Sequence, residues 1–213
     1  MKITILNSSS EHPVNDSLKI WIKKHQANHE IKLIRFKKNL VGGDILFLIS
    51  SSEIISMNER AKFKKSLLLH ASDLPKGRGW SPHVWEILNN ANQIVVSLLE
   101  VEDKFDTGDI WKKIKIDVPK TALYDDINQL IFKAEIELMD FALENIYNIH
   151  PSKQPTIEPS YWPKRNPKDS QIDIHKSIDE QFNLIRISDP KRFPSFFYKN
   201  GKKFKLIIEL MDE

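Results

Sequence analysis

A histidine and an aspartate, His70 and Asp106, are the side chains of this chain best suited to move a proton. His70 opens the segment 70–79, which is rich in Pro, Gly and basic residues, and Asp106 begins an Asp-Thr-Gly-Asp turn. An imidazole can exchange a proton near neutral pH, and a carboxylate beside it holds its tautomer and stabilises its charged form. The pair therefore predicts proton-transfer chemistry at the end of a sheet.

The segments around this pair alternate between strand and helix patterns. Ser81 and Pro82 predict a helix start, with Ser81 as the cap and Pro82 as the first helical residue. A short helix is expected around 58–65, and apolar residues at helical spacing predict a long helix over 123–146. Apolar runs predict strands over 2–7, 31–36, 44–49, 66–69, 94–99 and 110–116.

Strands that alternate with helices predict an α/β fold with a Rossmann-like, twisted, mostly parallel sheet flanked by helices and a small C-terminal α+β element. Sheets of this kind bind ligands beyond the carboxyl ends of their strands. Because His70 directly follows a predicted strand, we expect it to lie at that binding edge.

The composition changes after His150. Prolines recur at 151, 155, 159, 163 and 167, which is typical of a stiff, extended linker. Ser177 and Glu180 have the spacing of a capping box at a helix start, and Asn200-Gly201 predicts the turn of a β-hairpin. We therefore expect a catalytic domain over 1–150, followed over 151–213 by a Pro-rich linker, a small C-terminal helix and a β-hairpin.

The composition excludes several classes of site. The 213 residues include 32 Lys and Arg against 29 Asp and Glu, with the two signs interleaved, so no nucleic-acid partner is expected. The absence of cysteine excludes thiolate nucleophiles and Cys-based zinc sites. His25 and His29 have helical metal spacing but no supporting carboxylate cluster, so no metal is expected. No apolar segment approaches the length of a membrane span, so a cytoplasmic protein without a membrane partner is predicted.

Four segments, in this order, resemble the formyltransferases that use N10-formyltetrahydrofolate, a family with methionyl-tRNA, glycinamide ribonucleotide and sugar N-formyltransferases. They are His70-x-Ser72-x-Leu74-Pro75-Lys76-x-x-Gly79, Ser81-Pro82-x-x-Trp85-x-Ile87-Leu88, Val96-Ser97-Leu98-Leu99-Glu100 and Asp106-Thr107-Gly108-Asp109-Ile110. The resemblance is strongest over 44–118 and extends over 1–150. The tail Tyr161-Trp162-Pro163-Lys164-Arg165 is also similar to the region that follows this domain in the sugar and tRNA enzymes.

The resemblance implies the transfer of a formyl group from N10-formyltetrahydrofolate to a primary amine. By the family pattern, His70 assists deprotonation of the amine and stabilises the charged intermediate, while Asp106 orients His70 and helps relay the proton. Help of this kind is typically worth about 10²–10⁴ in rate.

One position departs from the family pattern. The family usually has an asparagine two residues before the histidine, whose amide polarises the formyl oxygen, and here that position is Leu68. Three explanations stay open: Ser72 or a backbone N–H substitutes as the donor, His70 alone suffices, or the chain is a weak or inactive enzyme. If Leu68 is merely a lost donor, Leu68→Asn should raise turnover, whereas a large drop would show a pocket rebuilt around an apolar side chain.

The resemblance also implies two walls of a folate pocket. The loop with Ser51, Ile54 and Ile55 would form one wall, and the loop that begins at Asp103 would form the other. Lys76 and Arg78 either bind a phosphate or the glutamate tail of the folate, or they are plain solvated charges. The remaining candidate folate contacts on the histidine loop are Leu74, Pro75 and Gly79.

Each of these signals also has a simpler explanation. His70 could cap a strand end, Asp106 could belong to an ordinary hairpin turn, and Ser72 could make only local turn bonds. Tyr161 and Trp162 either bind the substrate by stacking on a nucleotide base or pin a Pro-rich linker to the core.

The chain is most like the sugar N-formyltransferases, which implies a nucleotide-linked amino sugar as the acceptor, in surface-glycan synthesis, with the nonulosonic acid pathway as one option. Sugar enzymes of this family are often homodimers, so a homodimer is an open expectation. Formylation of another amine, on methionyl-tRNA or glycinamide ribonucleotide, is the enzyme alternative. A folate- or nucleotide-binding module that has lost the chemistry is the alternative outside enzymes.

Overall fold

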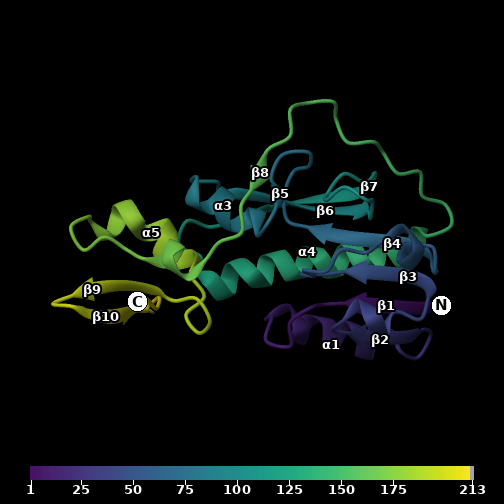
Figure 1. The fold of residues 1–213 in the computed structure, drawn as a ribbon, viewed down its shortest axis with the longest axis horizontal. Helices are drawn as coiled ribbons and strands as arrows, with labels where there is room; N and C mark the ends of the chain where they lie inside the picture. Colours follow the sequence, from purple (N-terminus) through teal and green to yellow (C-terminus); the bar gives the residue numbers. More distant parts are fainter. Residues whose placement is uncertain (212–213) are drawn as a thin grey trace.

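A six-stranded sheet forms the centre of the molecule in the computed structural model, which describes residues 1–211 (Figure 1). The strands lie side by side in the order β2-β1-β3-β4-β6-β7. The first four are parallel, whereas β6 runs antiparallel to β4, and β7 antiparallel to β6. The mostly parallel sheet is therefore confirmed, with an antiparallel edge. The strands are β1 (Lys2–Leu6), β2 (Glu30–Ile34), β3 (Gly43–Leu48), β4 (Phe63–His70), β6 (Gln93–Glu100) and β7 (Ile110–Asp117).

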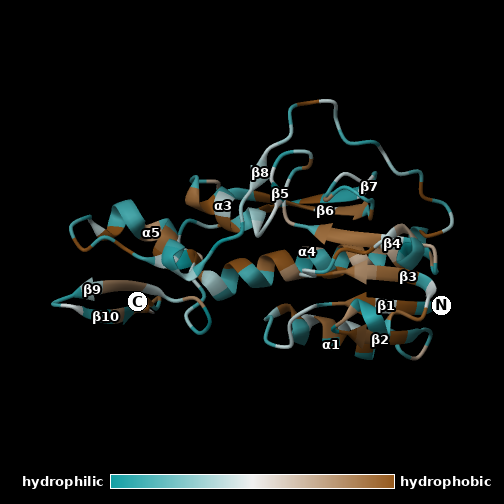
Figure 2. Ribbon diagram, in the orientation of Figure 1, coloured by the Kyte–Doolittle hydropathy of each residue, from teal (hydrophilic) through white to brown (hydrophobic). Residues whose placement is uncertain are grey.

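Helices α1 (Val14–His25) and α4 (Tyr124–Asn145) pack on one face of this sheet and against each other. The long helix α4 buries Ile127, Ile131, Leu138 and Ala142, whose spacing places them along one side. Figure 2 shows the same division, with hydrophobic strands at the centre and polar residues on the outer sides of the helices. The main hydrophobic core thus lies between the sheet and these two helices.

A smaller apolar cluster covers the opposite face of the sheet. It is built from the ends of β1 and β3 and from the segment between β3 and β4, which contains α2 (Met57–Arg60). Its buried members are Leu6, Leu40, Leu46, Leu48, Ile55 and Phe63. The short 3₁₀ turn Lys37–Asn39 lies in the connection before β3.

Two local predictions differ from the structure. The helix expected around 58–65 ends at Arg60, because Phe63 is buried in the second cluster and already pairs with Gly43 as part of β4. Helix α3 (Pro82–Leu88) does begin with a proline, but Ser81 makes no side-chain capping bond. The backbone of Ser81 has a left-handed φ of 45°, which turns the chain sharply into the helix.

The chain after α4 arches back over the sheet before it reaches the C-terminal elements (Figure 1). Ser152 exchanges two backbone hydrogen bonds with Ile110 at the start of β7. Further on, β8 (Tyr161–Trp162) pairs in parallel with β5 (Arg78–Gly79), inside the segment that follows His70. The Pro-rich segment is therefore extended, as predicted, and part of it is fastened to the sheet and to the histidine loop.

The predicted C-terminal elements are present. Helix α5 (Ile178–Ile187) begins with the Ser177–Glu180 capping box, and the hairpin of β9 (Ser195–Lys199) and β10 (Lys202–Leu206) turns at Asn200 and Gly201, both with positive φ. The 3₁₀ turn Pro167–Ser170 precedes α5. Buried Arg186 ties α5 to the sheet domain by donating to the carbonyl oxygens of Pro119 and Ala122. The division at residue 150 into two domains stays a prediction.

Among the described residues, no helix combines the length and the apolar character that a membrane crossing needs.

Candidate active site

His70 is the last residue of β4, and its side chain is buried. Its backbone pairs with Ser97 on β6, so the neighbouring strand fixes the position of the imidazole. The Nε2 atom lies 2.9 Å from the carbonyl oxygen of Gly77. Because a carbonyl can only accept, Nε2 carries the hydrogen and donates it. The Nδ1 atom faces Asp106, with 3.7 Å between Nδ1 and Oδ1.

Asp106 reaches His70 because the loop between β6 and β7 folds back over the sheet. The amide of Glu100 donates to the carbonyl oxygen of Asp109, and Gly108 passes so close that a Cβ there would stand 1.8 Å from the Glu100 carbonyl oxygen. Only glycine fits such an approach, so the glycine of the Asp-Thr-Gly segment is explained by backbone contact. Asp106 itself has a left-handed φ of 56°, a conformation that Asp and Asn adopt more readily than other side chains.

The loop after His70 is held from two sides. The amide of Gly79 donates to Asp106 Oδ2 at 2.8 Å, so the aspartate faces the imidazole with one oxygen and binds the loop with the other. On the other side, the amide of Gly77 donates to Ser160 Oγ at 2.8 Å, and the amide of Trp80 donates to the carbonyl oxygen of Trp162. The arching segment before β8 therefore fixes the loop against His70.

Several buried polar atoms on or beside this loop have no partner among the described residues: Ser72 Oγ, Arg78 Nε, His83 Nδ1 and Trp162 Nε1. Two of them, Ser72 Oγ and Trp162 Nε1, lie next to Gly77, because a Cβ placed on Gly77 would stand 3.3 Å and 3.2 Å from them. Both atoms can donate a hydrogen bond.

Further histidines around the site are neutral at pH 7. Burial, together with the neighbouring His12 and His70, lowers the pKa of His83 to about 4. Burial and the Arg192 guanidinium lower the pKa of His12 to about 4 as well, partly offset by Asp189. Burial and the nearby Asp73 raise the pKa of Glu86, on α3, to about 7. His12 and His83 therefore add no positive charge beside His70 at pH 7.

Comparisons with known proteins identify what this arrangement is related to. No protein-family model matches the chain. The chain is 33% identical over 148 residues to the methionyl-tRNA formyltransferase of Natranaerobius thermophilus, a match that covers 67% of this chain and 46% of that protein. The chain is a relative of the formyltransferases. A second methionyl-tRNA formyltransferase, from Rickettsia africae, is 28% identical over 80% of this chain and 56% of its own length, so the chain spans about half the length of the curated relatives it matches.

Solved formyltransferase structures share the fold over nearly the whole chain. A methionyl-tRNA formyltransferase from Clostridium thermocellum superposes with a TM-score of 0.83, at 22% identity, and covers 100% of this chain and 94% of its own. A 4-N formyltransferase from Francisella tularensis gives 0.73, also at 22% identity, over 100% and 98% of the two chains. An N-formyltransferase from Helicobacter canadensis, in complex with folinic acid and dTDP-3-aminofucose, gives 0.69 at 22% identity over 95% and 86%.

The position that departs from the formyltransferase pattern, Leu68, lies two residues before His70 on β4. It packs at the junction of two apolar clusters, one of which is formed by Leu74, Leu99 and Ile110. Leu68 therefore contributes to packing beside the site.

The residues expected to line a folate pocket lie in different environments. Ile54 is 58% exposed, whereas Ile55 is 3% exposed and belongs to the second hydrophobic cluster, so only Ile54 offers an apolar surface. Ser51 Oγ lies 3.3 Å from Ser8 Oγ, which joins its loop to the end of β1. Asp103, in the opposite loop, accepts from Arg60 at 2.8 Å.

The expected contacts on the histidine loop are brought together beside His70. Leu74 and Pro75 are buried, joined by a cis peptide bond, and Lys76 is exposed. Arg78 donates to Gln154 Oε1 and to the hydroxyl of Tyr161, a side chain that is 64% exposed. The loop therefore presents buried apolar residues inward and cationic groups outward.

Trp162 is stacked on Trp85, with 5.6 Å between ring centroids and 10° between the planes. The indole of Trp85 donates to the carbonyl oxygen of Pro163, while the indole N–H of Trp162 lies beside Gly77 without a partner among the described residues. Tyr161 thus faces solvent, whereas the indole N–H of Trp162 is buried beside the histidine loop.

Three residues that hold or surround the site were not anticipated from the sequence. Gln154 donates to the carbonyl oxygens of Asp106 and Gly108, Ser160 accepts from Gly77, and the half-buried His83 lies near His70. Gln154 and Ser160 stand in a Pro-rich segment far along the chain, where no spacing rule connects them to the loops they bind. His83 is the second residue of the helix that begins at Pro82, and no sequence pattern links it to His70.

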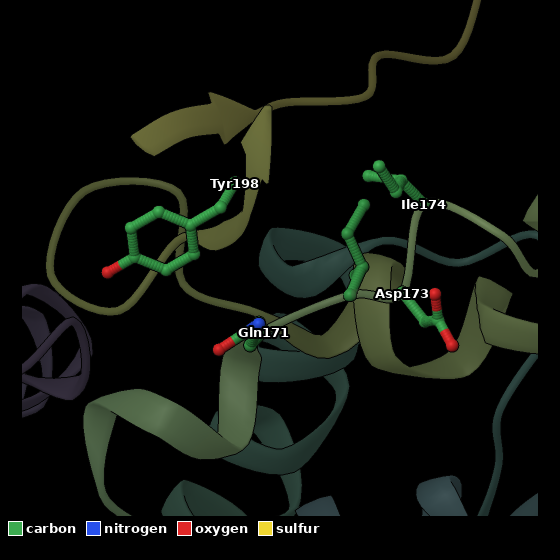
Figure 3. A pocket seen from close by; sticks show the side chains of 5 residues that line it. Gln171, Asp173, Ile174 and Tyr198 are labelled. Atoms are coloured by element: carbon green, nitrogen blue, oxygen red, sulfur yellow. The ribbon is translucent and has the colours of Figure 1, made fainter. Parts of the chain in front are cut away.

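A separate cavity of about 330 Å³ opens on the C-terminal element. Gln171, Ile172, Asp173, Ile174 and Tyr198 line it, with Tyr198 contributed by β9 (Figure 3). None of these residues contacts His70 or Asp106 through a hydrogen bond, so this cavity is distinct from the candidate active site.

Proposed function

We propose that this chain transfers a formyl group from N10-formyltetrahydrofolate to the primary amine of a nucleotide-linked amino sugar, in surface-glycan synthesis. The observation that carries the transfer chemistry is the buried contact between His70 and Asp106, 3.7 Å apart at the end of β4. These two residues lie 36 positions apart in the sequence and meet only because the loop of Asp106 folds back over the sheet (106 − 70 = 36).

The pair can accept the proton that an amine must lose. The carboxylate of Asp106 stabilises a positive charge on His70 by Coulomb attraction, and this attraction is stronger in a buried site than in water. The bond from the Gly79 amide to Asp106 Oδ2 holds the carboxylate in place while Oδ1 faces the imidazole. His70 would become the base once its hydrogen stands on Nδ1, facing Asp106, because Nε2 then has the lone pair that takes the proton from the amine. Asp106 would stabilise this tautomer and balance the charge of the imidazolium.

The buried apolar residues Leu74 and Pro75, on the loop that follows His70, are the feature of this structure that fits a folate beside the reactive pair. The folate supplies the formyl group that is transferred. Ile54, Leu74 and Pro75 would contact its apolar parts, and the exposed Lys76 would offer a cation to its glutamate carboxylates. These assignments are part of the proposal. They are supported by solved neighbours that have folinic acid or tetrahydrofolic acid bound.

A nucleotide-linked acceptor is supported by the cations and aromatic rings on the outer side of the same loop. Arg78 lies over the Tyr161 ring, with 5.9 Å to its centroid, and Lys164 lies 4.6 Å from the centroid of Trp80. Exposed aromatic rings can stack on a nucleotide base, and arginine or lysine can bind its phosphates. The N-formyltransferase neighbour with dTDP-3-aminofucose bound supports the same substrate class.

Methionyl-tRNA is the second candidate acceptor, because the curated relatives with 28–33% identity are methionyl-tRNA formyltransferases. Binding of a transfer RNA depends strongly on Lys and Arg contacts to phosphates. The net charge of +3 over the sequence gives weaker support for such a partner than for a small nucleotide. The cytoplasmic location expected from the sequence stays a prediction under either candidate.

The test incubates the full chain with N10-formyltetrahydrofolate and, in separate reactions, UDP- and dTDP-linked amino sugars, glycinamide ribonucleotide and methionyl-tRNA. Mass spectrometry then measures the N-formyl product. We expect product with a nucleotide-linked amino sugar, and none with His70→Ala or Asp106→Ala.

Formylation of methionyl-tRNA alone would replace the sugar with the second candidate. Tight binding of formylated folate without turnover on any amine would instead show a folate-binding module that has lost the chemistry. Leu68, which replaces the asparagine usual in the family, is the residue that suggests this alternative.

A further inference from the structure

The side chain of Gln154 joins the two loops that carry the reactive pair. Its Nε2 donates to the carbonyl oxygen of Asp106 at 2.7 Å and to that of Gly108 at 3.0 Å. Its Oε1 accepts from an Nη atom of Arg78 at 2.7 Å. Because carbonyl oxygens only accept and a guanidinium only donates, a single orientation of the Gln154 amide satisfies both sides. One side chain thus makes three hydrogen bonds that connect the aspartate loop with the histidine loop.

The backbone around Gln154 is fixed independently of these bonds. Two residues before it, Ser152 exchanges hydrogen bonds of 2.7 Å and 2.8 Å with Ile110 at the start of β7. Pro155 follows directly, and the residue before a proline is restricted to extended backbone conformations. The side chain of Gln154 is half-buried. The arch therefore brings this amide to the two loops at a defined place.

Asp106 is a residue that needs such a tether. Residues 102–105, which precede it, are all exposed, whereas the side chain of Asp106 is only 9% exposed. Its left-handed φ of 56° is a conformation that persists only where the surroundings enforce it. The two carbonyl oxygens that Gln154 binds belong to Asp106 and Gly108, so the amide fixes the backbone at both ends of this turn.

The contacts form a closed circuit around Asp106. Its Oδ2 accepts from the Gly79 amide, and its carbonyl oxygen accepts from Gln154. Gln154 in turn accepts from Arg78, which precedes Gly79 in the histidine loop. Both the backbone and the carboxylate of the aspartate are thereby tied to the loop that begins at His70. The 3.7 Å between Asp106 Oδ1 and His70 Nδ1 is therefore set by bonds at both ends of the aspartate.

We propose that Gln154 is a positioning residue that holds Asp106 in the geometry that His70 needs for proton transfer. The proposal rests on the formyl-transfer function proposed above. Gln154 binds the backbone of the aspartate and not its carboxylate, so it acts through Asp106. A displacement of about 1 Å in a catalytic group can lower a rate by about 10². The tether should therefore matter more for turnover than for substrate binding.

Gln154→Glu and Gln154→Leu separate the two sides of this amide. A glutamate carboxylate has a similar shape and can still accept from Arg78, but it has no hydrogen for the carbonyl oxygens of Asp106 and Gly108. Leucine makes none of the three bonds. We expect turnover to fall by about 10–10² in both variants, while the KM for the formyl donor stays close to the parent value. Lys153→Leu, at an exposed position of the same arch, is the matched control and should keep the parent turnover.

A double-mutant cycle tests the route by which Gln154 acts. If it acts through Asp106, Gln154→Leu should cause no further loss in the Asp106→Asn background, where the carboxylate charge is already gone. A general structural role would lower the rate by the same factor in both backgrounds. Single-turnover formyl transfer, with the product measured by mass spectrometry, gives the four rates of the cycle.

The amide proton of Gly79 provides a readout that needs no turnover. It is hydrogen-bonded to Asp106 Oδ2, so its chemical shift reports where the carboxylate lies. In ¹H–¹⁵N NMR spectra, this signal should move upfield from its parent position in Gln154→Glu and in Gln154→Leu, because the hydrogen bond weakens. Lys153→Leu should leave the signal at the parent position.

The outcomes separate this inference from the proposed function. A parent chain that forms no N-formyl product on any amine would overturn the proposed function, and the Gly79 signal would still show whether Gln154 holds the aspartate. Parent-like turnover together with an unmoved Gly79 signal in Gln154→Glu would overturn the positioning role. An equal loss from Gln154→Leu in both backgrounds at position 106 would overturn it as well.

Discussion

Asp106 shows how one side chain can serve both the chemistry and the backbone. It faces His70 with one carboxylate oxygen and binds the Gly79 amide with the other, from a left-handed conformation. Asp106→Asn separates these roles, because asparagine tolerates the same φ and its amide oxygen can still accept from Gly79. We expect turnover to fall by about 10²–10⁴ with little change in the thermal unfolding midpoint.

Initial rates of formyl transfer and thermal denaturation check this expectation, with Asp109→Asn as the control on the same loop. Full activity in Asp106→Asn would show that charge balance at His70 is not needed, and would leave Asp106 a structural role only.

Leu68 raises a different question at the residue scale. Its partly buried side chain packs at the junction of two apolar clusters, so an asparagine there would place an amide against Leu74, Leu99 and Ile110. Burying an amide without a partner costs about 1–3 kcal/mol in proteins. We therefore expect Leu68→Asn to lower the free energy of unfolding by about this amount, without raising turnover.

Urea denaturation and initial rates measure both effects, and Leu68→Met, which keeps the apolar volume, is the control. A rise in the turnover of Leu68→Asn would support the opposite view, in which Leu68 is only a lost donor.

The site was predictable from the sequence at the residues that carry a motif. His70 stands at a strand end and Asp106 begins a glycine turn, and the structure brings them together. Gln154 and Ser160 were not predictable in these roles, because each acts through a long-range backbone contact. Such contacts depend on how the segment after α4 arches back, which local patterns do not encode.

At the scale of elements, the pairing of β5 with β8 is the contact that completes the site. Gly79 has a φ of 101°, and a Cβ there would stand 2.4 Å from the Trp162 carbonyl oxygen. Gly79→Ala should therefore separate β8 from the loop and weaken the bond from the Gly79 amide to Asp106. We expect a loss of more than about 1 kcal/mol in unfolding free energy, together with a loss of formyl transfer.

Gly201→Ala is the matched control for this change. Gly201, in the β9–β10 turn, also has a positive φ, of 72°, but nothing lies within 4 Å of the point that a Cβ would occupy there. If the two variants lose stability and activity equally, backbone strain explains the effect and the close approach to Trp162 does not.

The regular elements were largely predictable, since the strands are short apolar runs and α4 has a long helical period. The exceptions have physical reasons. The helix expected around 58–65 stops at Arg60 because burial of Phe63 and pairing with β3 favour a strand. The two-residue strands β5 and β8 are too short to show a strand pattern, and their pairing joins segments that lie far apart in the sequence.

The stability of the whole molecule should depend on pH through a group outside the site. Glu135 is buried on α4, and burial raises its pKa to about 8 from an ordinary value of 4.5. The folded state therefore holds a proton that the unfolded state releases above about pH 4.5. Stability attributable to this group should fall as pH rises from 4.5 to 8, by at most about 1.4 kcal/mol per pH unit, and then level off.

Glu135→Gln removes this titration, because glutamine is neutral at every pH. The variant and the parent chain should be similar in stability near pH 5, and the variant should be more stable at pH 8, as measured by urea denaturation. Glu144→Gln, on the exposed side of the same helix, is the control. Parallel pH profiles for Glu135→Gln and the parent chain would contradict the prediction.

The arch between α4 and β8 also bears on how the protein is made. The loops that carry His70 and Asp106 are both fastened by residues between Gln154 and Trp162, which a ribosome synthesises roughly fifty residues after the aspartate (162 − 106 = 56). A nascent chain that has already formed the sheet and α4 therefore still lacks the contacts that fix the loops of His70 and Asp106. Competence for chemistry should appear late in translation, as a discrete event that follows the burial of the core.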